Sequence, residues 1–203
     1  MVLEVSHHGT APPSGPAFYF DLASPDAYLA AERVLQLMPV ATEWVPVLAS
    51  ALPAAESWDA FRCAEERSIA LARIERVAAQ RGLQALRWPD PFPFDSTMAM
   101  RAATYARQIG RTVAFSLAAF RQAFAGGRSL AVTDNVLIAG SACEMHPTAL
   151  LKALQTKGVA RALDAATAEA VGRGVRDVPA VWTGDRVFHG DADLDRAAKA
   201  LAA

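Results

Sequence analysis

The residue best placed to do chemistry in this chain is Ser24, which stands between a short aromatic run and a predicted helix. The segment Phe18-Tyr-Phe-Asp-Leu-Ala-Ser-Pro-Asp-Ala-Tyr28 passes from strand-forming residues into a Ser-Pro pair, a typical helix start. Unpaired N–H groups and the positive end of the helix dipole meet there, so the position favours a bound anion or thiolate. Helix capping alone would also explain the same pair.

A second turn of interest lies near the other end of the chain. The segment Gly174-Val-Arg-Asp-Val-Pro179-Ala-Val-Trp182 places a Val-Pro pair at the entrance of another apolar strand. This second turn weighs against capping as the whole explanation of Ser24.

Composition limits the classes of function. The chain has 203 residues, 53% of them hydrophobic, which is enough for one packed domain or one domain with a large insertion. The net charge of −1 and the scattered basic residues argue against nucleic-acid or anionic-membrane partners. No apolar run approaches the roughly 20 residues of a membrane span. We expect a cytoplasmic protein with no secretory signal.

The metal- and redox-active residue types form no site pattern. Cys63 and Cys143 are 80 residues apart and make no C-x-x-C pair, so we expect two reduced, buried thiols. His7 and His8 have no further ligand at a fixed spacing, so no metal site is predicted.

Periodicity and turn residues divide the chain into an α/β part and a helical part. Residues 1–16 are expected to form a flexible leader, and residues 53–157, rich in Ala, Leu and Arg, an inserted all-helical subdomain. The α/β domain takes residues 17–52 and 158–203. Its expected elements are strands at 17–22, 42–46, 180–183 and 186–189, and helices at 25–38, 159–172 and 191–201.

The two turns, taken with further motifs in order along the chain, resemble the thioredoxin fold. The resemblance is closest to the DsbA-type branch that holds 2-hydroxychromene-2-carboxylate isomerases and kappa-class glutathione transferases. It implies an α/β, thioredoxin-like fold with an inserted helical subdomain. The further motifs are Arg87-Trp-Pro-Asp-Pro-Phe-Pro93, Arg101-Ala-Ala-Thr-Tyr-Ala106, Phe115-Ser-Leu-Ala-Ala-Phe-Arg-Gln-Ala-Phe124 and Arg186-Val-Phe-His-Gly190.

The resemblance also assigns roles around the two turns. Ser24 and Ala27 stand where disulfide oxidoreductases carry the two cysteines of C-x-x-C, so electron transfer through a dithiol is excluded at this site. Ser24 is implied to activate the thiol of glutathione. Pro179 is implied to be cis, with the N–H and C=O of Val178 pairing with the glutathione backbone, and Asp191 is implied to hold the γ-glutamyl end.

An apolar substrate pocket is expected between the helical insertion and the loop at 88–94. Its candidate lining residues are Trp88, Phe92 and Phe94, with Tyr28 beside the serine turn. The alternative is that these aromatic residues only pack the insertion against the α/β core.

The sequence departs from the family pattern at the glutathione end. Ala192 and Asp193 replace the usual Asp and Arg of the last hairpin, and the loop at 49–56 carries no basic residue. Asp26, in the first turn after Ser24, is expected to oppose a nearby thiolate. His189 is expected to lie outside the reacting centre.

Three functions follow from these observations. The first is a glutathione-dependent isomerase that acts on a small aromatic or electrophilic acid, with Ser24 activating the thiol. The second is a transferase using glutathione or another low-molecular-weight thiol, which would account for the altered hairpin. The third is a non-catalytic thioredoxin-like binding protein in which Ser24 is only a cap. The resemblance adds a possible homodimer, since relatives are commonly dimers.

Overall fold

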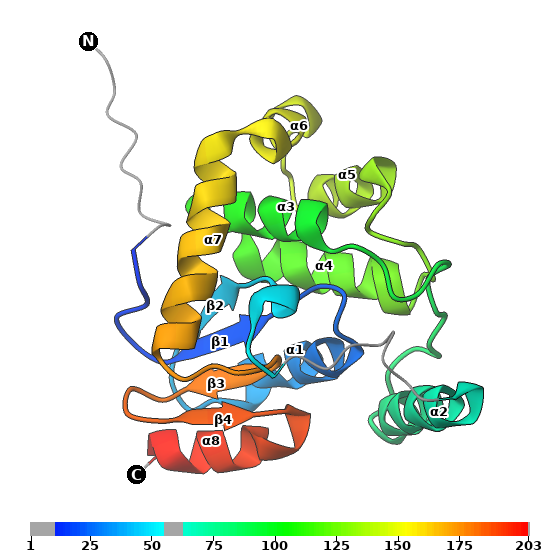
Figure 1. Cartoon of the computed structure of the whole chain (residues 1–203), viewed down its shortest axis with the longest axis vertical. Helices are drawn as coiled ribbons and strands as arrows, with labels where there is room; N and C mark the ends of the chain where they lie inside the picture. The colour runs from blue at the N-terminus through cyan, green and yellow to red at the C-terminus, as the bar shows by residue number, and fades with distance from the viewer. Residues whose placement is uncertain (1–10, 55–62, 203) are drawn as a thin grey trace.

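A four-stranded mixed sheet forms the centre of the computed structural model, which describes residues 11–54 and 63–202 (Figure 1). The strands lie in the order β2-β1-β3-β4. β1 pairs in parallel with β2 and antiparallel with β3, and β3 pairs antiparallel with β4. The bounds are Ala17–Phe20 for β1, Glu43–Pro46 for β2, Ala180–Trp182 for β3 and Val187–His189 for β4. The predicted α/β fold is confirmed.

Helices cover both faces of this sheet. Phe18 and Phe20 of β1 point to one face and join the core formed with α1, α3, α4 and α8. Ala17 and Tyr19 point to the other face, toward α7, as expected from the alternation of side chains along a strand. The bounds are α1 Pro25–Leu37, α3 Thr97–Gln108, α4 Thr112–Phe124, α7 Lys157–Gly172 and α8 Leu194–Ala202.

The described part of residues 53–157 is helical, as the sequence predicts, and contains no strand. Besides α3 and α4 it holds α2 (Ala64–Gln80), α5 (Thr133–Ser141) and α6 (Pro147–Gln155). In Figure 1, α2 stands to one side of the other helices. Only Ile74 and Ala78 of this helix are buried, so its position depends strongly on polar contacts.

Residues 11–16, the described part of the predicted leader, lie against the domain. Pro16 O accepts a hydrogen bond from Glu43 N at 2.9 Å, in continuation of the sheet. Arg173 donates to Pro13 O at 2.8 Å and Arg107 donates to Ala11 O at 2.9 Å. Residues 1–10 lie outside the described part of the chain.

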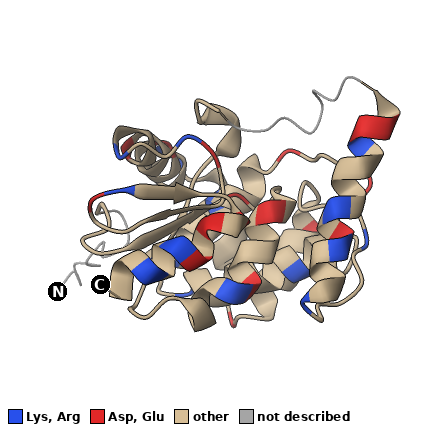
Figure 2. Ribbon diagram, turned by 90° about the horizontal axis from the view of Figure 1, so that it is seen from below, with Lys and Arg blue, Asp and Glu red and all other residues tan. Residues whose placement is uncertain are grey.

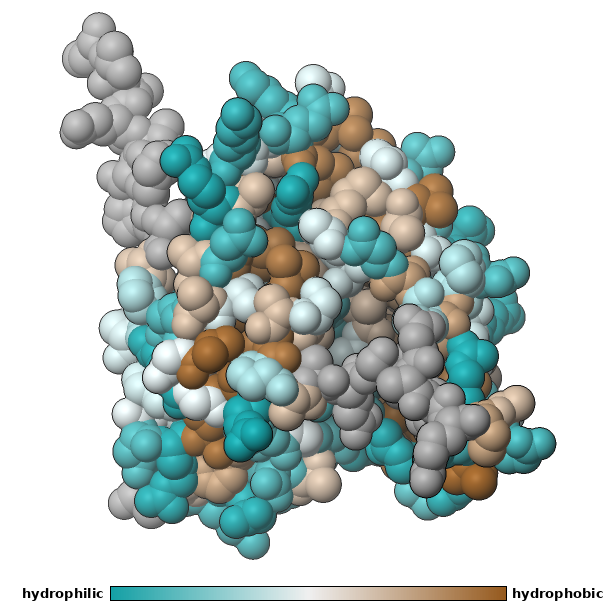
Figure 3. Space-filling model, viewed as in Figure 1, coloured by the Kyte–Doolittle hydropathy of each residue, from teal (hydrophilic) through white to brown (hydrophobic). Residues whose placement is uncertain are grey.

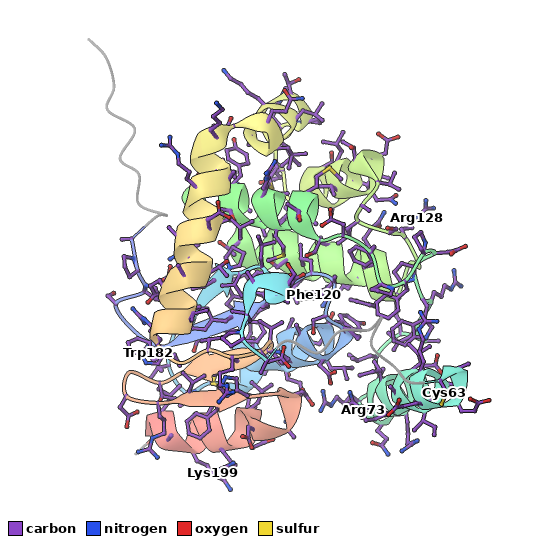
Figure 4. All side chains as sticks on the ribbon, in the orientation of Figure 1. Cys63, Arg73, Phe120, Arg128, Trp182 and Lys199 are labelled. Carbon is purple, nitrogen blue, oxygen red and sulfur yellow. The ribbon has the colours of Figure 1, made fainter. Side chains whose placement is uncertain are left out.

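Two sequence predictions need correction. The last helix was expected over 191–201, but a 3-10 turn, η2 (Asp191–Asp193), precedes α8. Cys63 was expected to be buried and is exposed, because it lies at the N-cap of the projecting helix α2 (Figure 4). Cys143 is buried as predicted, and this burial raises the pKa of its thiol.

Charged residues of both signs are interspersed along the helices (Figure 2). On the face shown in Figure 3, hydrophobic side chains form small separate groups among hydrophilic ones. In the described part of the chain, no helix combines the length and apolar character needed to cross a membrane.

Candidate functional site

A cleft of about 1220 Å³ lies beside the N-terminus of α1. Of the predicted catalytic and cofactor-binding residues, it brings together Ser24, Val178, Pro179 and Asp191. These residues come from the β1–α1 loop, the turn before β3 and η2. The cleft therefore joins the two ends of the chain, as the fold prediction requires.

Ser24 is the N-cap of α1. Its Oγ accepts a hydrogen bond from Ala27 N at 3.1 Å, and Pro25 occupies the first helical position. A hydroxyl has two acceptor lone pairs and one hydrogen to donate, so capping leaves that hydrogen available to a ligand in the cleft. Capping and activation of a thiol are therefore compatible at this residue.

The Val178–Pro179 peptide bond is cis, as the resemblance implies. Val178 N, however, donates a hydrogen bond to Asp177 Oδ1 at 2.7 Å. One of the two backbone groups expected to pair with a peptide-like ligand is thus already engaged by a neighbouring carboxylate. A ligand that accepts a hydrogen bond from Val178 N must displace the Asp177 carboxylate or share this N–H with it.

Asp21 is a site residue that the sequence analysis missed. Its side chain is 2% exposed and accepts hydrogen bonds from Ala23 N at 2.9 Å, Ala49 N at 2.9 Å and Ser96 Oγ at 3.0 Å. Burial raises the pKa of the Asp21 carboxyl, although these hydrogen bonds act in the opposite direction. An acidic residue directly after a wholly apolar strand was the available signal.

The contacts of Asp21 determine the shape of the loop that presents Ser24. They join the β1–α1 loop to η1 (Ala49–Ala51) and to the start of α3. Within the loop, Asp21 O accepts from Ser24 N at 3.1 Å, and Leu22 N donates to the sulfur of Met100 at 3.2 Å. The carboxylate therefore acts as a positioning group for Ser24.

Asp26 is paired with an arginine from α2. Arg73 donates to both carboxylate oxygens of Asp26, at 2.9 to 3.1 Å, and extends from α2 toward α1 in Figure 4. The negative charge expected to oppose a thiolate near Ser24 is thus balanced by a guanidinium. Such bidentate pairs have a well-defined geometry.

The other end of the cleft holds a second group of ion pairs. Arg81, the C-cap residue of α2, makes a bidentate pair with Asp191, with Nη1 donating to Oδ1 at 2.9 Å. Arg33 of α1 lies 3.6 Å from Asp191 and donates to Asp195 at 3.0 Å. Two arginines, Arg33 and Arg81, therefore lie at this end of the cleft, although Asp193 stands at the hairpin position where the resemblance predicts an arginine.

The α2 residues in the cleft follow one helical face. Arg73, Val77 and Arg81 recur every four residues, so they lie one above another, and all three line the cleft. The buried residues Ile74 and Ala78 pack the adjacent face into the core. The spacing was visible in the sequence, but the residues it would face were not.

The predicted aromatic pocket is only partly formed. Phe94 lines the cleft, whereas Tyr28, Trp88 and Phe92 are not among its lining residues. Tyr28 is 2% exposed and packs against Phe124 with ring centroids 5.6 Å apart, and burial raises its pKa to about 12. The rings of Trp88 and Phe92 contact each other and Phe124.

His189 does not line the cleft. Its Nε2 accepts a hydrogen bond from Arg176 N at 3.0 Å, and burial lowers its pKa. Among the described residues, no group of three or more His, Cys, Asp or Glu is arranged to hold a metal ion.

The fold and this cleft define a thioredoxin-like protein in which a helix-capping serine, not a cysteine, lines the same cleft as the cis-proline turn. The chain belongs to the family of DSBA-like thioredoxin domains, whose model matches residues 17–202. No curated protein sequence gives a significant match.

Several solved structures share this fold. A 2-hydroxychromene-2-carboxylate isomerase superposes with a TM-score of 0.81 at 18% identity, over 92% of this chain and 94% of that one. A probable DsbA oxidoreductase from Streptomyces coelicolor has a TM-score of 0.77 at 19% identity, over 92% and 88% of the chains. A cytosolic disulfide reductase, DsbM, from Pseudomonas aeruginosa has 0.63 at 14%, over 92% and 95%. At these identities the likeness shows the fold.

Proposed function

We propose that the protein is a thiol-dependent isomerase, in which Ser24 activates the thiol of glutathione or a related small thiol. The observation that carries this proposal is the position of the Ser24 hydroxyl. It caps α1 at the wall of a large cleft that also contains the cis Val178–Pro179 turn. The proposed substrate is a small aromatic or otherwise electrophilic acid.

The residues at this end of the cleft fit a thiolate. The Ser24 hydroxyl can donate a hydrogen bond to sulfur, and the N-terminal end of α1 adds a favourable field, so both lower the thiol pKa. Arg73 of α2 offsets the charge of Asp26, which lies in the first turn of α1 directly after Ser24. When bound, the thiol would supply the nucleophile that adds reversibly to an electron-poor double bond and so permits its rotation.

The remaining parts of the site would bind and orient the reactants. Asp21 maintains the loop that presents Ser24, while Pro93 and Phe94 offer apolar surface in the cleft. Since the thiol would be regenerated, the protein itself need only place the two reactants together and stabilise charge.

The test is turnover of 2-hydroxychromene-2-carboxylate in the presence and absence of reduced glutathione. The proposal predicts thiol-dependent isomerisation that Ser24→Ala reduces by about a hundredfold or more, as for loss of one well-placed donor. Other acids that carry an electron-poor cis double bond would be assayed in parallel, because 2-hydroxychromene-2-carboxylate is the substrate named for a structural neighbour. No Ser24-dependent thiol chemistry with any of them would contradict the proposal.

A second candidate is a transferase that uses glutathione or another small thiol on an electrophile. A third, a non-catalytic binding protein, is supported by the hydrogen bond from Ala27 N to Ser24 Oγ, which is sufficient reason for a serine at this position. A stable thioether product would favour the second candidate, and unchanged ligand binding in Ser24→Ala would favour the third.

A further inference from the structure

We infer that the end of the cleft around Arg33, Arg81 and Asp191 binds the distal oxyanion of the thiol, a carboxylate or phosphate, and does not bind an ammonium group. This inference rests on the proposed function. It concerns which small thiol the site accepts, because the distal group is where such thiols differ.

Two guanidinium groups already surround the carboxylate of Asp191. Both of its carboxylate oxygens pair with Arg81, and Arg33 Nη1 lies 3.6 Å from Oδ1. Its side chain is only 12% exposed. An ammonium group that approached Asp191 would also meet two guanidinium groups at a partly desolvated position, where like charges repel more strongly than in water. Asp191 is therefore poorly suited to the ammonium of a γ-glutamyl group.

Arg33 is the group best able to receive an oxyanion. It lines the cleft, and its side chain is 28% exposed. Its Nη2 donates to Asp195, whose side chain is 55% exposed and whose attraction is therefore weakened by water and salt. Its Nη1 is too far from Asp191 for a hydrogen bond. A guanidinium carries five N–H donors, so Arg33 retains donors for a ligand.

Arg81 fixes the position of Asp191 relative to α1. Besides Asp191, its Nη1 contacts Leu29 O at 3.3 Å, so one side chain joins α2, α1 and η2. Its charge neutralises Asp191, so the charge of Arg33 is opposed chiefly by Asp195, the more exposed carboxylate of the cleft lining. The γ-glutamyl end of glutathione carries both a carboxylate and an ammonium. We expect the carboxylate to bind and the ammonium to contribute nothing.

The test is calorimetric titration of the full-length protein with three thiols. Glutathione carries both distal groups, glutaryl-cysteinyl-glycine lacks only the ammonium, and N-acetyl-cysteinyl-glycine lacks both. The glutaryl thiol should bind at least as tightly as glutathione, and the acetyl thiol about tenfold more weakly. A parallel titration with 4′-phosphopantetheine distinguishes phosphate from carboxylate as the preferred oxyanion.

Substitutions test whether Arg33 is the residue that causes the preference for a thiol with a distal carboxylate. Arg33→Gln should abolish the roughly tenfold difference between the glutaryl and acetyl thiols. Arg196→Gln is the matched control, since Arg196 pairs with Asp193 outside the cleft lining and should leave the difference unchanged.

Three results would overturn the inference. They are glutathione binding about tenfold tighter than the glutaryl thiol, equal binding of the glutaryl and acetyl thiols, or no binding of any oxyanion-ended thiol. The proposed function would then be tested separately, by whether Ser24→Ala reduces thiol-dependent isomerisation. Conversely, Arg33-dependent binding of the S-methylated glutaryl compound, with no effect of Ser24→Ala on the free thiols, would support the inference and contradict the proposed function.

Discussion

The two ends of the cleft are built differently. Around Ser24, short-range hydrogen bonds of the β1–α1 loop and the buried carboxylate of Asp21 hold the backbone in place. Around Asp191, long arginine side chains from α1 and α2 meet aspartates from the C-terminal part of the chain. The first end is suited to one fixed chemical task, whereas the second can change its ligand through side-chain substitutions alone.

The largest expected effect separates catalysis from capping at Ser24. Ser24→Ala should lower thiol-dependent turnover by about a hundredfold or more and cost about 1 kcal/mol of stability through the lost cap. Ser24→Asp should retain the cap, because a carboxylate also accepts the Ala27 N–H, yet should be as inactive as Ser24→Ala. Turnover and urea unfolding measured on the same preparations check both statements. Normal activity in Ser24→Asp would show that capping is the relevant property.

The next effect concerns the rigidity of the Ser24 end. Asp21→Asn should lower the free energy of unfolding by about 2 kcal/mol, because either orientation of the amide turns its NH2 group toward the backbone N–H of Ala23 or of Ala49, whereas the carboxyl group presents an oxygen to both. For a chain of this size, that corresponds to a melting temperature lower by roughly 4–8 °C. Ser96→Ala, which removes one of the three donors, is the matched milder variant. Equal stability of Asp21→Asn and wild type would contradict the positioning role.

Asp21 should also contribute a pH dependence of known sign. Burial raises its folded pKa above the unfolded value, so its contribution to stability is fully present at low pH and is lost as pH rises through the folded pKa. The stability difference between wild type and Asp21→Asn should therefore decrease as pH rises from about 4 toward neutrality. Unfolding measured across this range checks the direction, and an increase would contradict it.

A smaller effect tests the pair that flanks Ser24. Arg73→Gln leaves Asp26 without this guanidinium and should slow thiol-dependent turnover near neutral pH by about threefold, because the thiol pKa rises. Asp26→Asn should act in the opposite direction. The pH profile of turnover measures both variants, and shifts of the same sign would contradict the electrostatic explanation.

The smallest effect concerns a residue that the structure places outside the cleft lining. Tyr28→Phe should leave thiol-dependent turnover within about twofold of wild type and change stability by less than about 1 kcal/mol, since the apolar ring contacts are retained. A tenfold loss of kcat/KM would instead support the predicted substrate-contacting role of Tyr28.

The difference between the two ends also explains what the sequence could predict. Ser24, Pro25 and the Val178–Pro179 pair carry local signatures of capping and turn chemistry, and their place in the cleft followed from the fold resemblance. The strands and helices of the α/β part were predicted to within a few residues, because apolar periodicity and proline mark them.

The other end depends on side chains that are distant in sequence. Arg33, Arg81 and Asp191 meet only once α2 is placed beside α1, and no local pattern specifies that placement. The aromatic residues illustrate the same limit. Trp88, Phe92 and Phe94 belong to one short loop, yet only Phe94 lines the cleft, since side chains outside a regular helix or strand follow no simple period.

The most direct test of the central claim is the pKa of the bound thiol, followed by the ultraviolet absorbance of its thiolate as pH is raised. With glutathione or the glutaryl thiol saturating the wild-type protein, the thiol should titrate at least about one pH unit below the same thiol in solution. In Ser24→Ala most of this shift should disappear. A bound thiol that titrates as in solution, or an equal shift in Ser24→Ala, would contradict the assignment of Ser24 as the activating group.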